Sequence, residues 1–182
     1  MMSMCSIARA HHIGCHADQY AQYEGLTVNA AEAIDSAGGT IIASDGRPML
    51  TTPEAEAGLE NLVTAYADGN IPQETIAFTE EDGRLAFEAG NPLVLRSWPY
   101  VDDPAKNGAA SAAQDTLGMA ALPGLSGPGA SSLGSHSAAA SVFSKAVTTS
   151  VEKNAHAAIQ GQLRVDVALA RMQQAIGDAN GG

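Results

Sequence analysis

Apolar positions that recur at helical spacing predict most of the secondary structure of this chain. They mark helices that have a capping residue at the start or a glycine at the end, over residues 27–37, 53–67, 79–89, 151–160 and 165–176. In the helix that begins at Thr79, we expect Leu85, Ala86 and Ala89 to form the buried stripe. A weaker, alanine-rich helix is predicted over residues 102–114.

Short β-branched or apolar runs predict the strands, at residues 40–43, 93–95, 117–122 and 138–143. The run Leu93-Val94-Leu95 is continuous, which is typical of a strand buried on both faces. Residues 124–134 are rich in glycine, serine and proline and predict a loop. Helices that alternate with short strands predict an α/β or α+β fold, with helices packed on a short sheet.

The order of these elements divides the 182 residues into three segments. Residues 1–22 have no sustained period and predict a poorly ordered leader. Residues 23–145 hold the predicted strands and form the main lobe, and residues 146–182 form closing helices and a frayed tail. A chain of this length can bury a substantial core, which must come mainly from alanine, valine, leucine and isoleucine because only 4% of the residues are aromatic.

The charge of the chain excludes some classes of partner. Nine Lys and Arg against twenty Asp and Glu give a net charge of -11, which repels phosphate backbones and anionic membrane surfaces. We therefore expect no nucleic-acid partner. No stretch approaches the apolar length of a spanning helix, so we also expect no direct membrane span, and residues 1–15 lack the apolar run of a secretory signal.

Potential metal ligands gather near the N-terminus, namely Cys5, His11, His12, Cys15 and His16. Thiolate and imidazole groups suit zinc, but the cluster has no Cys-x-x-Cys block and falls in the predicted leader. We favour an accidental cluster and predict no metal and no cofactor. Two cysteines are too few for a disulfide framework, and they do not fix the cellular compartment.

The sequence offers little for covalent catalysis. Ser135 and His136 are neighbours in the predicted loop, but no Gly-x-Ser-x-Gly elbow surrounds them. The acidic residues 80–82 are better explained as partners of a helix dipole than as a general acid and base. We predict that the chain is not an enzyme, and a small hydrolase that uses Ser135 or His136 is the alternative.

The segment Arg96-Ser97-Trp98-Pro99-Tyr100 directly follows the predicted strand at residues 93–95. Loops that follow strands are where open α/β sheets hold ligands, and Trp98 is the only tryptophan of the chain. The apolar face and N–H edge of an indole match the apolar face and hydroxyl rim of a pyranose ring. Trp98 is therefore a candidate sugar platform, and the alternative is a tryptophan that fills the core.

Several segments, taken in order, resemble one known family. They are Ala21-Gln22-Tyr23-Glu24-Gly25-Leu26-Thr27, Ser36-Ala37-Gly38-Gly39, Pro53-Glu54-Ala55, Thr79-Glu80-Glu81-Asp82, Phe87-Glu88-Ala89-Gly90, Arg96-Ser97-Trp98-Pro99-Tyr100 and Ala121-Leu122-Pro123-Gly124. Their order and spacing resemble the carboxy-terminal lobe of the sugar-binding proteins of ABC transporters, the group that includes the trehalose/maltose-binding proteins. The closing helices over residues 154–176 resemble that family too, so the resemblance covers most of residues 21–176.

This resemblance implies one lobe of a periplasmic-binding-protein-like type II fold, which closes over a sugar and presents it to a membrane permease. By position, Trp98 would be the stacking aromatic, with Tyr23, Glu24 and Arg96 as hydroxyl partners. Glu24 and Arg96 could equally form a structural ion pair. His136 stands where the family often has a tryptophan and is the last candidate contact. The implied partners are an oligosaccharide such as trehalose or maltose and ABC permease subunits.

The chain also departs from the family pattern. Nothing before Ala21 resembles the first lobe, the signal peptide or the lipidated cysteine of the family, and helices usually expected after Ser144-Lys145 are missing. We therefore expect a truncated member in which residues 23–145 form a partial sugar-binding lobe with weakened affinity. The resemblance implies an extracellular or periplasmic location, whereas the sequence as written fits the cytoplasm. A degenerate remnant that binds no sugar is the alternative.

Overall fold

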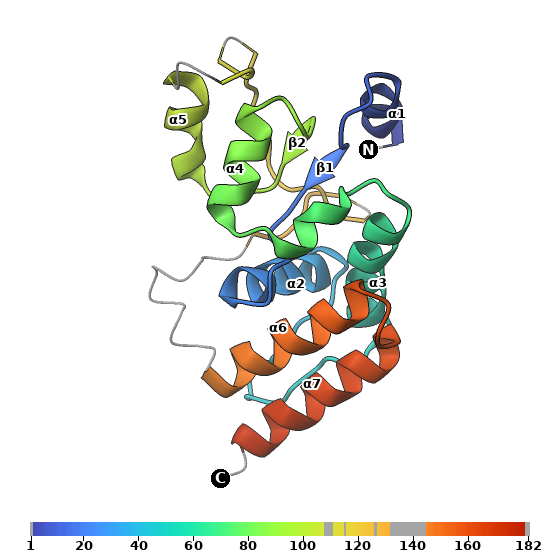
Figure 1. Cartoon of the computed structure of the whole chain (residues 1–182). Coiled ribbons are helices and arrows are strands. Elements are labelled where there is room, and N and C mark those ends of the chain that lie inside the picture. The colour runs from blue at the N-terminus through green and yellow to red at the C-terminus, as the bar shows by residue number, and fades with distance from the viewer. Residues whose placement is uncertain (1, 108–110, 115, 126, 132–144, 181–182) are drawn as a thin grey trace. The chain divides into compact units, whose positions relative to one another are not determined.

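The computed structural model describes residues 2–107, 111–114, 116–125, 127–131 and 145–180 (Figure 1). The helices of these residues are α1 (Met2–Ala10), α2 (Glu24–Ser36), α3 (Pro53–Ala67), α4 (Glu80–Glu88), α5 (Asp102–Asn107), α6 (Lys145–Ile159) and α7 (Val165–Asn180). The described residues also form two short 3-10 helices, η1 (Gln73–Ala77) and η2 (Pro99–Val101), and two strands, β1 (His16–Ala17) and β2 (Val94–Leu95).

The chain forms two compact units, each built from two stretches of sequence. Unit 1 comprises Met1–Ala21 and Ala65–Ala120, and unit 2 comprises Gln22–Thr64 and Ala121–Gly182. The position of the units relative to one another is not determined. The units do not coincide with the predicted segments 1–22, 23–145 and 146–182, because each unit combines stretches that are distant in sequence.

Unit 1 contains a two-stranded parallel sheet. Strand β1 pairs with β2, with His16 opposite Val94 and Ala17 opposite Leu95. Parallel pairing requires a long connection between the strands, and here the connection runs from Asp18 far along the chain before it returns to β2. The sheet therefore joins the beginning of the chain to its middle.

Helix α4 begins at the capping signal predicted for it. The backbone N–H of Thr79 donates to Asp82 Oδ2 at 2.9 Å. The helix packs on β2 through the buried Gly83, where a β-carbon would lie 3.2 Å from Leu95 Cδ1. The predicted apolar stripe is wrong, since Leu85 is 55% exposed. The close approach of the helix and the strand favours glycine, the smallest residue, at the contact. A pattern of apolar residues does not predict a buried glycine.

Unit 2 is built from helices, and α6 contacts both α2 and α7. Figure 1 shows α6 lying between these two helices. Helix α2 is buried along most of its length and supplies Leu26 and Ile34 to the core. Helix α7 supplies Leu169, Met172 and Ile176 at the spacing of one helical face. The core of this unit is therefore aliphatic, as the composition predicts.

Most predicted helices are confirmed, with shifted ends. Helix α2 begins at Glu24, before the predicted cap Thr27. Helices α6 and α7 are separated as predicted at Gly161, whose φ of 71° lies in the left-handed region that glycine adopts without strain. Helix α5 ends at Asn107, so it is shorter than the helix predicted over residues 102–114, of which residues 108–110 lie outside the described part.

The predicted poorly ordered leader contains regular structure. Residues 2–10 form α1, and Cys5 is joined to Cys15 by a disulfide bond. Strand β1 follows, and Ala17 and Tyr20 are fully buried. A terminal segment is ordered when a sheet pairing and a covalent bond tie it down, and neither produces a periodic pattern.

The strand predictions are mostly wrong. Residues 40–43 form only an isolated bridge between Ile42 and Pro48, and residues 117–122 form no strand where the structure describes them. The strand at residues 93–95 exists as β2, but its two residues are only half-buried and Leu93 is exposed, so the prediction of burial on both faces is wrong. The strand predicted at residues 138–143 lies outside the described residues.

Candidate functional site

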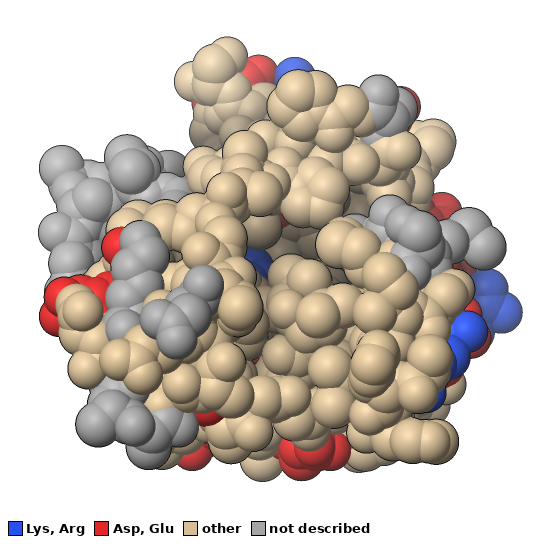
Figure 2. Space-filling view, turned by 90° about the horizontal axis from the view of Figure 1, so that it is seen from above, with Lys and Arg blue, Asp and Glu red and all other residues tan. Residues whose placement is uncertain are grey.

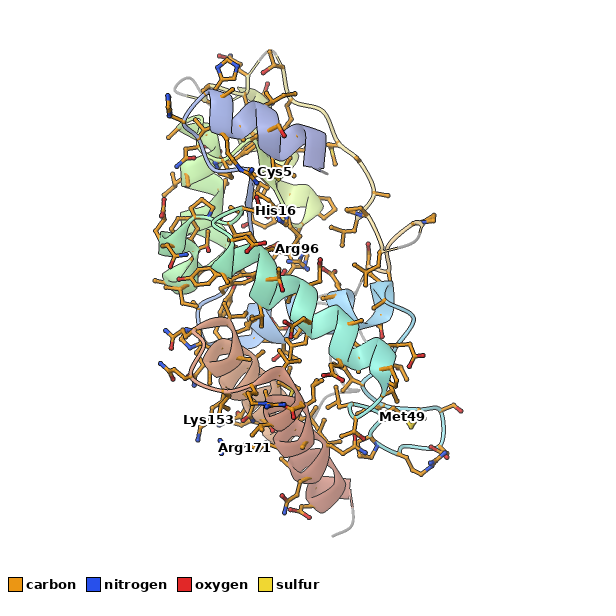
Figure 3. All side chains as sticks on the ribbon, turned by 90° about the vertical axis from the view of Figure 1, so that its right-hand side faces the viewer. Cys5, His16, Met49, Arg96, Lys153 and Arg171 are labelled. Atoms are coloured by element: carbon orange, nitrogen blue, oxygen red, sulfur yellow. A yellow bond between two sulfur atoms is a disulfide. The ribbon has the colours of Figure 1, made fainter. Side chains whose placement is uncertain are left out.

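The parallel pairing of β1 and β2 brings the residues that follow both strands to one edge of the sheet. Asp18 and Gln19 follow β1, and Arg96, Ser97 and Trp98 follow β2. We call these five residues the strand-end cluster. Open sheets bind ligands outside the carboxyl ends of parallel strands, so this edge is the candidate site of unit 1. Figure 3 labels Arg96 and also His16, the residue of β1 that pairs with Val94.

Arg96 is held in place by Gln19. Its Nη1 donates to Gln19 Oε1 at 3.1 Å, and Gln19 Nε2 donates to the backbone oxygen of Arg96 at 2.9 Å. Arg96 is 6% exposed and Gln19 is fully buried. Two reciprocal hydrogen bonds in a buried setting fix the direction of the guanidinium group, since breaking either would leave a buried polar atom without a partner.

The Arg96 guanidinium lies over the Trp98 ring. Its Cζ is 4.2 Å from the ring centroid, the geometry of a cation–π contact. The residue Trp98 is half-buried, so the indole is not enclosed in the core. The contact orients the ring and occupies one of its faces. Any ligand that stacks on Trp98 therefore uses the opposite face or the exposed edge.

Ser97 contributes a polar atom that sequence reasoning did not single out. Its Oγ is buried and has no hydrogen-bond partner among the described residues. Such a group is uncommon in folded proteins, because an unsatisfied buried hydroxyl is costly. Asp18 and Gln19 were also missed. Their segment has no periodic pattern, and no signal in the sequence connects them to Arg96.

The side chains of His16, Asp18 and Tyr20 interact with one another at the same edge of the sheet. Tyr20 donates its hydroxyl to Asp18 Oδ2 at 3.2 Å, and His16 Nδ1 lies 3.6 Å from the same oxygen. Burial raises the pKa of the Tyr20 phenol well above its ordinary value of 10.0, and the charge of Asp18 and their hydrogen bond raise it further. Tyr20 therefore acts as a neutral hydrogen-bond donor to Asp18 in the segment that follows β1.

We predict that alkaline conditions destabilise the protein through Tyr20. The unfolded state loses this proton near pH 10 while the folded state retains it, so stability is complete below that pH and falls as pH rises above it, by up to about 1.4 kcal/mol per pH unit. In Tyr20→Phe this dependence should flatten, as measured by urea unfolding between about pH 9 and about pH 11. Tyr66 and Tyr100, whose pKa values are also raised, contribute to the slope that remains. Parallel curves for the two proteins would contradict the prediction.

The other predicted site residues are distributed differently. Tyr23 is the N-terminal cap of α2 and Glu24 is its first residue, so both belong to unit 2. The structure brings Arg96 and Trp98 together in unit 1. His136, together with Ser135, lies outside the described residues. The roles of Tyr23, Glu24 and His136 stay predictions.

The N-terminal metal cluster is not supported. Cys5 and Cys15 are joined in a disulfide, so their sulfurs are not free thiolates (Figure 3 labels Cys5). Among the described residues, no group of three or more His, Cys, Asp and Glu side chains could hold a metal ion. The cysteines therefore stabilise the fold locally.

No protein-family model matches the chain. A solved structure, the maltose-bound MalE3 of T. maritima, superposes with a TM-score of 0.82 at 19% sequence identity, over 98% of this chain and 63% of that chain. The chain has the fold of a substrate-binding protein lobe. The prediction of a periplasmic-binding-protein-like fold, with helices packed on a short sheet, is thereby confirmed.

The sequence also matches curated proteins directly. One of them is a probable ABC transporter-binding protein of Deinococcus radiodurans, 34% identical over 126 residues. The match spans 68% of this chain and 29% of the relative, so the chain covers less than a third of that protein's length. Within the described residues, none of the helices combines the length and the apolar character needed to cross a membrane.

Proposed function

We propose that this chain belongs to the solute-binding component of a carbohydrate ABC importer and holds a sugar non-covalently. The observation that carries the proposal is the placement of Trp98, half-buried and stacked on Arg96, at the carboxyl ends of two parallel strands. The name of the curated relative supports the transport role, and the maltose in the structural neighbour supports the ligand class.

In this proposal no bond is made or broken. The free side of the indole receives the apolar face of a pyranose ring, and Arg96 positions the ring rather than acting on the sugar. The hydroxyl of Ser97 lies in the same cluster and is the proposed polar complement, while Gln19 holds Arg96 in place. Tyr23, Glu24 and His136 are proposed as further contacts on the strength of the family resemblance alone.

The proposed setting is extracellular or periplasmic, with ABC permease subunits as partners. The disulfide between Cys5 and Cys15 supports this location, because disulfides form and persist mainly in oxidising compartments. We propose that the chain by itself binds sugar weakly, since it offers fewer contacts than the full length of its relative would.

Titration with trehalose and maltose tests the proposal, and calorimetry is the readout because Trp98, the only tryptophan, cannot report on its own removal. The unmodified chain should bind at least one of the two saturably. Trp98→Ala should weaken binding at least about tenfold, which corresponds to about 1.4 kcal/mol. Tyr100→Ala is the matched control, since Tyr100 is an exposed aromatic two residues away.

Two outcomes would overturn this function. Equal affinity in Trp98→Ala and the unmodified chain would remove Trp98 from the site. An absence of binding to any oligosaccharide, with far-UV circular dichroism showing intact helices, would favour a degenerate remnant.

A further inference from the structure

Three cations gather in one hollow of unit 2, although the chain carries a net charge of -11. The hollow has a volume of about 610 Å³ and lies between α6 and α7. It is lined chiefly by Lys145, Thr149, Ser150, Lys153, Asn154 and Arg171. Figure 3 shows Lys153 and Arg171 on this helix pair, and among the described residues that line the hollow none is acidic.

The arrangement follows from helical spacing. Lys145, Thr149 and Lys153 are four residues apart on α6 and therefore share one face. Arg171 approaches from α7, the helix that packs against α6. Like charges gathered in this way repel one another, and a bound anion would relieve that repulsion.

These three cations differ from the others in having no side-chain partner, polar or acidic, among the described residues. Five other cations with described side chains each bond a polar or acidic group: Arg9 to Asn70, Arg47 to Asp45, Arg84 to Glu81 and Glu88, Arg96 to Gln19, and Arg164 to Asp166. Lys145, Lys153 and Arg171 make no such contact with any described residue. Charged residues make up only 16% of the chain, and most of the face in Figure 2 is uncharged.

The polar groups of the hollow favour a phosphate over a carboxylate. Thr149 and Ser150 add two hydroxyl donors to the three cations. Asn154 is 8% exposed, and its Nδ2 donates to the backbone oxygen of Ser150 at 2.8 Å, which fixes the wall beside these donors. A single carboxylate has two oxygens and one charge, whereas phosphate groups offer more oxygens and more charge for the same set of donors.

We propose that this hollow binds a small molecule that carries phosphate groups. The site is separate from the strand-end cluster, since its lining residues belong to unit 2, and it does not depend on sugar binding. Lys153 and Arg171 supply the charge that attracts the ligand, and Thr149 and Ser150 supply directed hydrogen bonds.

Calorimetric titration with inorganic pyrophosphate tests this site, against sodium chloride at matched ionic strength. We expect saturable binding that Lys153→Gln and Arg171→Gln each weaken at least about tenfold. Arg47→Gln is the matched control, because it removes the same charge from unit 2 at an exposed residue that already has a partner, Asp45. Its affinity for pyrophosphate should be unchanged.

Two further experiments distinguish a lipid headgroup from a soluble phosphate compound, and this site from the proposed sugar site. Vesicles of phosphatidylglycerol that bind the chain where pyrophosphate does not would assign the phosphate to a lipid headgroup. Trp98→Ala should retain pyrophosphate binding even if it no longer binds sugar. Two outcomes would overturn the site. One is that neither pyrophosphate nor the vesicles give heats larger than those of sodium chloride. The other is that Arg47→Gln weakens binding as much as Lys153→Gln and Arg171→Gln do.

Discussion

Replacing Gly58 by alanine is expected to destabilise unit 2 by about 1–3 kcal/mol, although alanine is the better helix former. Gly58 lies in α3, and a β-carbon at this position would stand 2.6 Å from the backbone oxygen of Ala33 and 2.6 Å from Ile34 Cα. These are backbone atoms of α2, so no side chain can rotate away. The two helices would have to move apart and open the aliphatic core.

Gly177→Ala is the matched control for this substitution. Gly177 lies in α7, and a β-carbon there would meet nothing within 4 Å. Alanine should therefore stabilise that helix by up to about 1 kcal/mol through its higher helix propensity. Far-UV circular dichroism during urea unfolding measures both variants. If the two changed stability in the same direction, close packing of α2 and α3 at Gly58 would be refuted.

Removing the disulfide is expected to lower the stability of unit 1 by about 2–3 kcal/mol. Cys5 and Cys15 are separated by ten residues and are both buried, and with Ala8 and Ile13 they form a small apolar cluster under α1. Cys15 also leads directly into β1, and its backbone oxygen accepts the N–H of Val94 at 3.0 Å. Loss of the bond frees α1 and loosens the end of the sheet.

The double variant Cys5→Ala/Cys15→Ala tests this prediction, with Trp98 fluorescence as a reporter of unit 1 during urea unfolding. Its transition should fall at lower urea, and a reductant should shift the unmodified chain to the same position. The variant itself should not respond to the reductant. Identical transitions for the oxidised and reduced protein would show that the bond does not hold this unit together.

The helices of this protein follow from signals that act within a few residues. Thr79 and Asp82 form the start of α4 by a contact across one turn, and Gly161 separates α6 from α7 through its own backbone conformation. Such contacts need no distant partner, so a sequence pattern predicts them. Trp98 was singled out for a similar reason, because it follows a recognisable strand and is the only indole.

The sheet and the site depend on partners far along the chain. Arg96 bonds Gln19 across 77 residues, and the bond exists only because β1 pairs with β2. No periodic pattern marks the two residues of β1, and nothing near Leu85 indicates that Gly83 would take the buried contact. Likewise, Lys153 and Arg171 meet only when α6 packs on α7. Local chemistry determined which segments become helices, and long-range packing decided which side chains stand together, because the free energy of that packing belongs to contacts between elements.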